Sequence, residues 1–189
     1  AELERDAEGG VVAVLGTVQD VTERLEAEGR IRHLALHDYL TGLPNRLLFD
    51  ERLAAGVAAA VARGHTLALH CLDLNDFKGL NDTLGHEAGD ELLRQVAARL
   101  SALVQDADLV ARLGGDEFAL LQHEVDGPGQ AAELAGRVLA TLALPFRIGG
   151  KEVFSSASLG IALSAGAELG PGDLLRQADV VSIHIPGGE

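Results

Sequence analysis

Apolar and polar residues alternate along the chain in blocks of two kinds, which predict strands and helices. Short apolar runs bounded by polar or Gly-rich segments are typical of buried strands. Longer Ala- and Leu-rich stretches with apolar residues three and four apart are typical of amphipathic helices. The predicted strands are residues 66–74, the two arms of a hairpin within 109–121, and 151–164. The predicted helices are 46–62, 90–104, 130–142 and a last one that begins near 171.

The order of these elements predicts the fold class. It is neither a strict alternation of strand and helix nor a series of strands alone. A mixed or antiparallel sheet with helices packed on one or both faces accounts for it best, which is an α+β fold. The segment 75–89, between the first strand and the second helix, is polar and interrupted by Gly, so we expect it to form turns.

The first part of the chain is expected to be separate from this unit. Residues 11–18 are apolar and β-branched, as in a strand, but a polar turn precedes them and no partner strand is visible. Residues 21–36 carry an approximate helical stripe, with Asp20 or Thr22 as the candidate N-cap. This helix is a candidate connector that pairs with its copy in another chain.

The composition narrows the functional classes. With 189 residues, 47% of them hydrophobic, the chain has room for one domain with a sizeable aliphatic core. A net charge of −14 argues against a nucleic-acid partner, which needs a basic surface. No signal peptide and no apolar run of about 18 residues is visible, so we expect a cytoplasmic protein without membrane contact. Cys71, the one cysteine, is expected to be a buried bystander, and the lack of Met indicates a piece of a longer polypeptide.

Acidic residues mark a candidate site at the ends of two predicted strands. Asp73 stands near the end of the first strand, and Asp116 and Glu117 follow the two glycines at the tip of the hairpin. If that strand lies beside the hairpin, Asp73 and Asp116 come to roughly 5 Å of each other, the inter-strand spacing. Carboxylates that close repel one another unless a cation lies between them, and oxygen ligands alone favour Mg²⁺, Mn²⁺ or Ca²⁺ over zinc. The alternative is that each acid is a solvated turn residue.

The polar segment after the first strand has the residue types of an anion or nucleotide site. Backbone N–H groups in turns can hold phosphate oxygens, and Lys78 can supply a positive charge. Asn81 and Asp90 carry short hydrogen-bonding side chains that can pair with the edge of guanine. Helix capping is the alternative for both, and Asp90 stands where the N-cap of the helix 90–104 is expected.

Three segments together resemble the GGDEF domain, the diguanylate cyclase family. They are HDYLTGLPNR (37–46), LDLNDFKGLNDTLGHEAGDELL (72–93) and RLGGDEF (112–118), and they follow the family's order over about 140 residues. The region before them is similar to the last strand of a PAS sensor domain and its outgoing helix. The implied parts are the end of a PAS-like domain (1–20), a linker helix (21–37), the GGDEF domain (38–179) and an atypical tail (180–189).

The resemblance implies a ferredoxin-like palm of the nucleotidyl-cyclase type, with a mostly antiparallel sheet flanked by helices. It implies that two GTP condense to cyclic di-GMP and two pyrophosphates in a homodimer to which each domain brings one GTP. The implied ligands of Mg²⁺ or Mn²⁺ are Asp73, the Leu74 carbonyl, Asp116 and Glu117. Asp116 and Glu117 are also the implied catalytic residues, with the metal and base roles undivided between them. The implied GTP-binding residues are Phe77, Lys78, Asn81, Asp90, Gly114 and Gly115.

The sequence departs from the family's pattern at two places. Where many members have Arg-x-x-Asp, the motif of the product-inhibition site, this chain keeps Asp108 but has Gln105 in place of the arginine. Gln lacks the bidentate fork of arginine, so we expect a degenerate site and weak or absent product inhibition. The family's last helix continues with cations that reach the phosphates, whereas this chain has no Lys or Arg after Arg176. The second departure leaves open a GTP-binding regulatory module without turnover, or a poorly folding fragment.

Overall fold

The computed structural model describes residues 2–5, 7–15, 20, 22–105, 107–164, 170–180 and 183–184. The chain divides into two compact units, Ala1–Ala35 and Leu36–Glu189.

The first unit contains a hairpin of β1 (Glu2–Arg5) and β2 (Val11–Leu15), followed by the helix α1 (Thr22–Leu36). The expectation of a strand without a partner is therefore wrong: β1 is that partner, but it is short and polar and gives no strand pattern. Residues 16–18 of the predicted strand lie outside the described part. Of the two candidate caps of α1, Asp20 is the acceptor, since its carboxylate accepts the Thr22 N–H at 2.9 Å.

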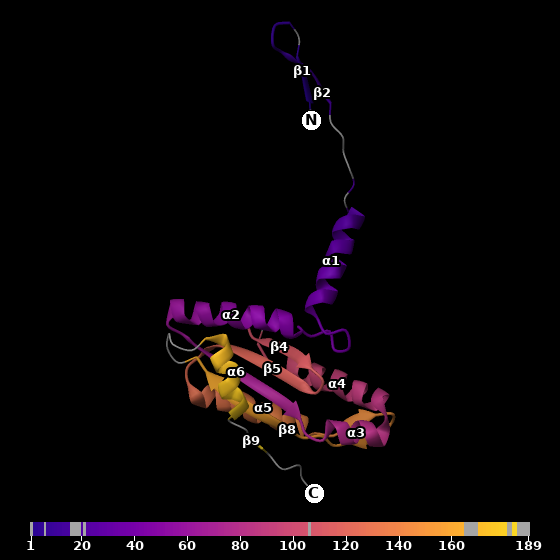
Figure 1. Cartoon of the computed structure of the whole chain (residues 1–189), viewed down its shortest axis with the longest axis vertical. Coiled ribbons are helices and arrows are strands. Elements are labelled where there is room, and N and C mark those ends of the chain that lie inside the picture. Colours follow the sequence, from indigo (N-terminus) through magenta and orange to yellow (C-terminus); the bar gives the residue numbers. More distant parts are fainter. Residues whose placement is uncertain are drawn as a thin grey trace. The chain divides into compact units, whose positions relative to one another are not determined.

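The second unit is built around a five-stranded antiparallel sheet in the order β4-β5-β3-β8-β9 (Figure 1). Its strands are β3 (Thr66–Leu74), β4 (Leu109–Gly114), β5 (Glu117–Val125), β8 (Ala157–Leu163) and β9 (Ile183–His184). Its helices are α2 (Arg46–Arg63), α3 (Phe77–Leu84), α4 (His86–Ser101), α5 (Pro128–Leu142) and α6 (Pro171–Val180). A separate small hairpin joins β6 (Phe146–Ile148) to β7 (Lys151–Val153). The predicted α+β fold, an antiparallel sheet flanked by helices, is confirmed.

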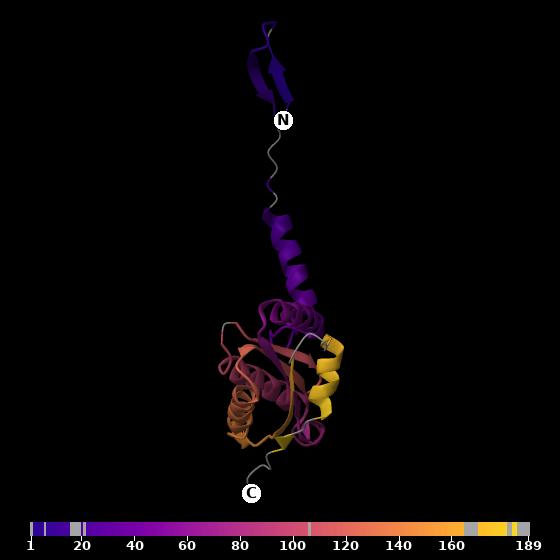
Figure 2. The ribbon, with the colours of Figure 1, turned by 90° about the vertical axis from the view of Figure 1, so that its left-hand side faces the viewer.

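The alternation of side chains along β3 decides which helix each one meets. Leu67 and Leu69 belong to a core cluster with residues of α2 and α6, whereas Leu72 and Leu74 belong to one with residues of α4 and α5. Helices therefore cover both faces of the sheet, and Figure 2 shows α6 (yellow) and α5 (orange) on opposite sides of it. Asp73 alternates with Leu72 and Leu74, so its side chain lies on the face that α2 and α6 cover.

Two predicted elements are wrong in detail. The polar segment 75–89 forms α3 and the first turn of α4 rather than turns alone, and Gly85, at φ 87°, separates the two helices. The predicted strand 151–164 is two strands, because the chain leaves its pairing after Val153 and resumes it at Ala157. Its first part pairs with β6 and its second part with β3.

The atypical tail adds an edge strand to the sheet. Within it, β9 pairs antiparallel with β8, Ile183 opposite Leu159 and His184 opposite Ser158. The boundaries expected for the PAS-like remnant, linker, GGDEF domain and tail remain predictions. Within the described ranges, no helix has the length and apolarity to cross a membrane.

Candidate active site

The three acids meet where β3 ends and β5 begins. The predicted neighbourhood of the strand and the hairpin is confirmed, and in the antiparallel register the residue directly opposite Asp73 is Glu117. Asp116 lies in the turn just before β5, and its backbone carbonyl accepts the Leu74 N–H at 3.3 Å. The fold therefore brings Asp73, Leu74, Asp116 and Glu117 to one end of two neighbouring strands.

The electrostatics of this end are those of crowded negative charge. Partial burial, followed by the charges of Asp116 and Glu117, raises the pKa of the Asp73 carboxyl above its ordinary value. A bound cation would relieve this repulsion, because the field of a positive ion favours the ionised carboxylate. Carboxylate and carbonyl oxygens are the donor set that Mg²⁺ and Mn²⁺ prefer, so the residues present fit such an ion.

A cavity of about 340 Å³ opens beside these acids, on the face that α2 and α6 cover. Its lining includes Asp73 and Glu117 from the strands, Arg46 from α2, and Leu175 and Ala178 from α6. The Arg46 Nη2 donates to the Glu117 Oε2 at 3.2 Å, so the carboxylate of Glu117 is held by α2. Cys71, expected to be a buried bystander, is half-buried and also lines this cavity.

The acids do not form a closed metal cage in this arrangement. Asp116 is half-buried but is not part of the cavity lining, and Glu117 is engaged with Arg46. Across the described ranges, no group of three or more His, Cys, Asp or Glu side chains stands close enough together to hold a metal ion. A cation shared by all three acids therefore requires their side chains to come closer together than they are here.

The two glycines form the turn that delivers Asp116 and Glu117. Gly114 and Gly115 have φ values of 142° and 53°, in the region that L side chains rarely adopt. The pairing of β4 with β5 is irregular between Arg112 and Gly114, which brings Gly114 opposite Glu117. A side chain at either glycine would strain this turn, so the glycines fix where β5 starts.

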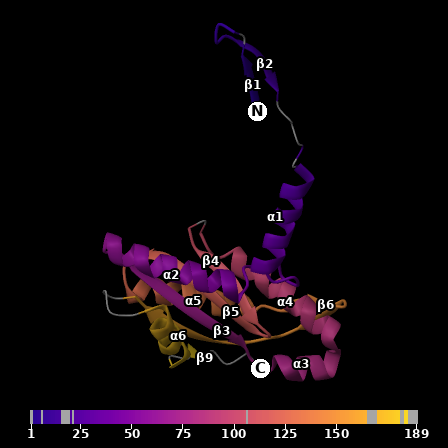
Figure 3. The same ribbon diagram turned by 45° about the horizontal axis from the view of Figure 1, so that its top comes forward.

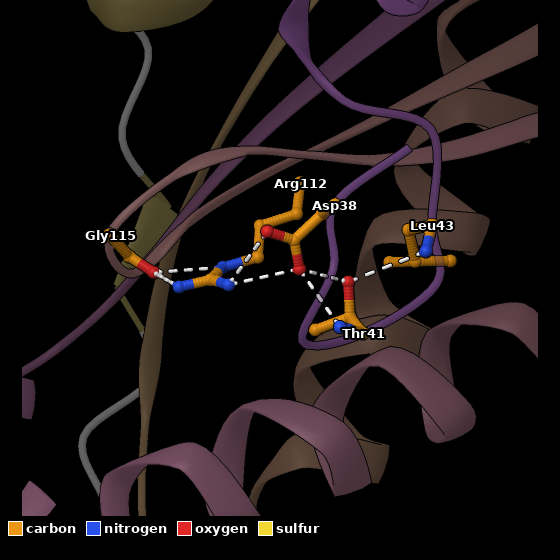
Figure 4. A network of polar contacts seen from close by, with 5 residues as sticks. All are labelled: Asp38, Thr41, Leu43, Arg112 and Gly115. Atoms are coloured by element: carbon orange, nitrogen blue, oxygen red, sulfur yellow. Dashed lines mark hydrogen bonds and ion pairs between the residues drawn. The ribbon is translucent and has the colours of Figure 1, made fainter. Parts of the chain in front are cut away.

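A largely buried ion pair between Arg112 and Asp38 contacts the glycine turn (Figure 4). The Arg112 Nη1 donates to both carboxylate oxygens of Asp38 at 3.0 Å, while its Nε and Nη2 donate to the Gly115 carbonyl at 3.0 and 2.7 Å. The side chains of Arg112 and Asp38 are only 10% and 16% exposed. Burial alone would raise the pKa of Asp38, but hydrogen bonds from Thr41 and Arg112 outweigh it and lower that pKa. The loop around Asp38 is thereby tied to the glycine turn.

Arg112 and Asp38 were not among the predicted site residues, and neither was Arg46. The sequence provided one indication that these residues matter: each lies in a segment that carries the family resemblance. Nothing in their spacing indicated that they would face the glycine turn or the acids.

The helix α3 follows β3 almost directly (Figure 3). Phe77 is its first residue and packs partly buried against the core, whereas Lys78 is exposed. The N-cap residue Asp76 has the left-handed φ of 55° and makes no capping bond with its side chain. The backbone donors that the sequence indicated for phosphate are therefore those of a helix N-terminus, which favours anions.

Asn81 and Asp90 lie on facing helices, and neither caps one. Asp90 is inside α4, which begins at His86, so the N-cap interpretation is wrong. The Asn81 Oδ1 is buried without a hydrogen-bond partner among the described residues. A Cβ on the neighbouring Gly89 would lie 1.9 Å from that oxygen, so only glycine leaves room for it. An unsatisfied buried acceptor is costly, which marks this position for a ligand that donates.

Gln105 and Asp108, the residues expected to form a degenerate product-inhibition site, lie next to each other at the start of the β4–β5 hairpin. The Asp108 carboxylate accepts the N–H of Gln105 at 3.3 Å and the N–H of His123 at 2.9 Å. Gln105 itself is exposed. The one charged residue that the motif retains is thus engaged with the backbone of its own hairpin.

Comparison with known proteins places this site in a family. Residues 35–182 match the family model "Diguanylate cyclase, GGDEF domain". The chain belongs to the GGDEF family. The chain is 42% identical to the bifunctional diguanylate cyclase/cyclic di-GMP phosphodiesterase MucR of Pseudomonas aeruginosa over 163 residues, 86% of this chain and 24% of MucR. The chain spans only a minor part of the curated relatives it matches, from 18% to 39% of the first four.

Solved structures agree with this assignment of the fold. The GGDEF domain of TpbB from Pseudomonas aeruginosa superposes with a TM-score of 0.73 at 40% identity, covering 76% of this chain and 84% of that one. The coiled coil and GGDEF domain of DgcB from Caulobacter crescentus, solved with c-di-GMP, gives a TM-score of 0.77 at 29% identity, covering 84% of each chain. The ferredoxin-like cyclase palm expected from the sequence is the fold of this family.

Proposed function

We propose that this chain is the catalytic GGDEF domain of a signalling protein and condenses two GTP into cyclic di-GMP and two pyrophosphates. In each half-reaction the 3′-oxygen of one GTP bonds to the α-phosphorus of the other, pyrophosphate leaves, and the hydroxyl proton passes to a base. The observation that carries the proposal is that Asp73 and Glu117 line a cavity at the strand ends, with Asp116 in the adjoining turn. Partial burial and then the charges of Asp116 and Glu117 raise the pKa of Asp73.

The roles of the residues follow from their chemistry. Asp73, Asp116, Glu117 and the Leu74 carbonyl would hold Mg²⁺ or Mn²⁺, which neutralises charge on the transferring phosphoryl group. Phe77 and Lys78 at the start of α3 would meet the phosphates, and Gly114 and Gly115 let the backbone pass close to the nucleotide. Asp116 and Glu117 share the metal and base roles.

Recognition of guanine is assigned to Asn81 and Asp90. The partnerless Oδ1 of Asn81 supports this role, because the guanine edge presents N–H donors. A carboxylate such as Asp90 accepts from two such donors at once. A GTP held there by one domain needs a second domain to supply the other GTP, so the working form is a homodimer.

The test is a chromatographic assay of the chain with GTP and Mg²⁺. We expect cyclic di-GMP and pyrophosphate in a ratio of one to two, with no product after a chelator is added. The initial rate should rise more steeply than in proportion to protein concentration while dimers are sparse. Saturable GTP binding without any product would instead establish the alternative, a GTP-binding regulatory module, for which the missing C-terminal cations are the argument.

We further expect that cyclic di-GMP does not inhibit this domain at micromolar concentration. Gln105 lacks the guanidinium fork that a phosphate or guanine edge requires, and the Asp108 carboxylate already accepts two backbone N–H groups. A calorimetric titration of cyclic di-GMP into the chain should show no binding in that range. Micromolar binding that disappears in Asp108→Asn would contradict this prediction, and Gln105→Arg is the variant that should gain affinity.

A further inference from the structure

Arg46 provides the positive charge of the acidic cavity. Asp73 and Glu117 place two carboxylates in the lining, and Arg46 is the only Lys or Arg among the described residues that line it. Its contact with Glu117 uses one guanidinium nitrogen, Nη2, at 3.2 Å. The side chains of Arg46 and Glu117 are 52% and 54% exposed, and ion pairs this open contribute little to stability. The pair can therefore separate at small cost.

The backbone that carries Arg46 is firmly placed. Arg46 is the first residue of α2, and the side chain of the N-cap residue Asn45 accepts the Leu48 N–H at 3.2 Å. The carbonyl of Pro44 accepts the Arg112 N–H at 3.0 Å, which fastens the start of α2 to β4. Arg46 thus has a long, exposed side chain that lines the cavity and a backbone held in place by these hydrogen bonds.

The described side chains that α6 brings to the cavity carry no positive charge. Among the side chains of α6 that the structure describes, Leu175 and Ala178 line the cavity, and the helix ends at Val180. Further turns of that helix would bring the positions four and eight residues after Ala178 to the same face, and these are Ser182 and Pro186 in the sequence. Arg176 pairs with Asp173 on α6 and does not line the cavity.

We propose that Arg46 is a phosphate-binding residue of this domain: it holds Glu117 while the site is empty and turns to the triphosphate of GTP when the site is loaded. This inference rests on the proposed function. The guanidinium has five donors in a planar fork, which matches phosphate oxygens bidentately. Once Glu117 serves a divalent cation, Arg46 loses its partner within the cavity and its donors are available to the nucleotide. The two states differ in which anion Arg46 meets.

The test compares Arg46→Gln with Arg52→Gln, which removes the same charge at an exposed position of the same helix. Binding is measured by calorimetry with guanosine and with a GTP analogue that has a methylene group between the α- and β-phosphates, so that turnover does not interfere. Affinity for Mn²⁺ without nucleotide is measured by the electron paramagnetic resonance of the free ion. We expect Arg46→Gln to weaken binding of the analogue by about 10- to 100-fold and to leave guanosine binding unchanged.

The same variant should bind Mn²⁺ more tightly without nucleotide, because Glu117 no longer has a competing partner, while Arg52→Gln matches the wild type in every measurement. Equal binding of the analogue by wild type and Arg46→Gln would overturn the role of Arg46 and leave the proposed function standing. Weaker binding of guanosine as well as the analogue would also overturn it, since that indicates a distorted site. A wild type that binds neither ligand would instead refute the proposed function itself.

Discussion

Replacing Asp73 by Asn should lower the rate of cyclic di-GMP synthesis by about 10³-fold without weakening the fold. Asp73 is the acid at the centre of the crowded strand ends, opposite Glu117 and close enough to Asp116 for both charges to raise its pKa. Asn keeps the shape of the side chain but binds a divalent cation far less well. The loss should therefore appear in turnover and in metal binding together.

Replacing Asp73 should not reduce the stability of the fold, unlike the replacement of an acid whose charge stabilises the folded state. A folded-state pKa above the unfolded value means that the ionised form of Asp73 disfavours the folded state, so stability falls as the pH rises through that pKa. Because Asn is neutral, the variant lacks this unfavourable contribution of the ionised carboxylate to the free energy of folding. In metal-free buffer at neutral pH, the melting temperature of Asp73→Asn should equal or exceed that of the wild type, and its stabilisation by Mg²⁺ should vanish.

The matched control is Asp126→Asn, which removes the same charge at an exposed position just after β5. It should keep wild-type turnover and the wild-type thermal shift with Mg²⁺. Calorimetry of Mg²⁺ binding and the chromatographic assay are run on all three proteins. If Asp73→Asn kept more than about a tenth of the turnover, or if it melted well below the wild type without metal, the assignment of Asp73 as a metal ligand would be wrong.

The sequence indicated most of the sheet and the residues of the acidic site, because apolar runs and acids at strand ends are local features. It did not indicate α3, since that helix is polar and its stability comes from Phe77 and Leu80 packing against the distant core. It also did not indicate that Glu117 is the residue opposite Asp73, because the residue at which β5 begins depends on the glycine turn. In a hairpin such as β4–β5 the pairing register is fixed by the turn type and loop length.

The sequence also did not indicate the ion pairs that position the site, because their partners are far apart along the chain. The partners Arg112 and Asp38 are 74 residues apart, and Arg46 and Glu117 are 71 residues apart. A charged residue gives no local sign of its distant partner. Only the tertiary structure therefore distinguishes Arg112, whose side chain is largely buried, from the exposed arginines of α2. The Arg112–Asp38 ion pair therefore supports a prediction that the sequence alone could not have supported.

Replacing Arg112 by Gln should destabilise the domain by about 3 kcal/mol, the lower end of the range for removing one partner of a buried pair. The substitution leaves the carboxylate of Asp38, only 16% exposed, with Thr41 as its remaining side-chain donor. It also releases the carbonyl of Gly115, which now accepts two bonds from Arg112. In a domain of this size the melting temperature should fall by roughly 6–12 °C.

The pH dependence identifies the cause of that loss. The pKa of Asp38 is lowered in the folded domain, so its pairing stabilises at pH values above its unfolded pKa of about 3.9, and this contribution disappears as the pH falls through the lower folded value. The gap in free energy of unfolding between wild type and Arg112→Gln should therefore be full near neutral pH and should shrink below about pH 4.

The control for this experiment is Arg94→Gln, because Arg94 pairs with Glu91 on the surface of α4 with both side chains largely exposed. It should cost less than about 0.5 kcal/mol. Urea unfolding of the three proteins between neutral and acidic pH measures both effects. A loss for Arg112→Gln no larger than for Arg94→Gln, or one that stayed constant with pH, would show that the glycine turn does not depend on this ion pair. We also expect Arg112→Gln to synthesise less cyclic di-GMP at temperatures where it is still folded. Both results together would show that the Arg112–Asp38 pair holds Asp116 and Glu117 in place.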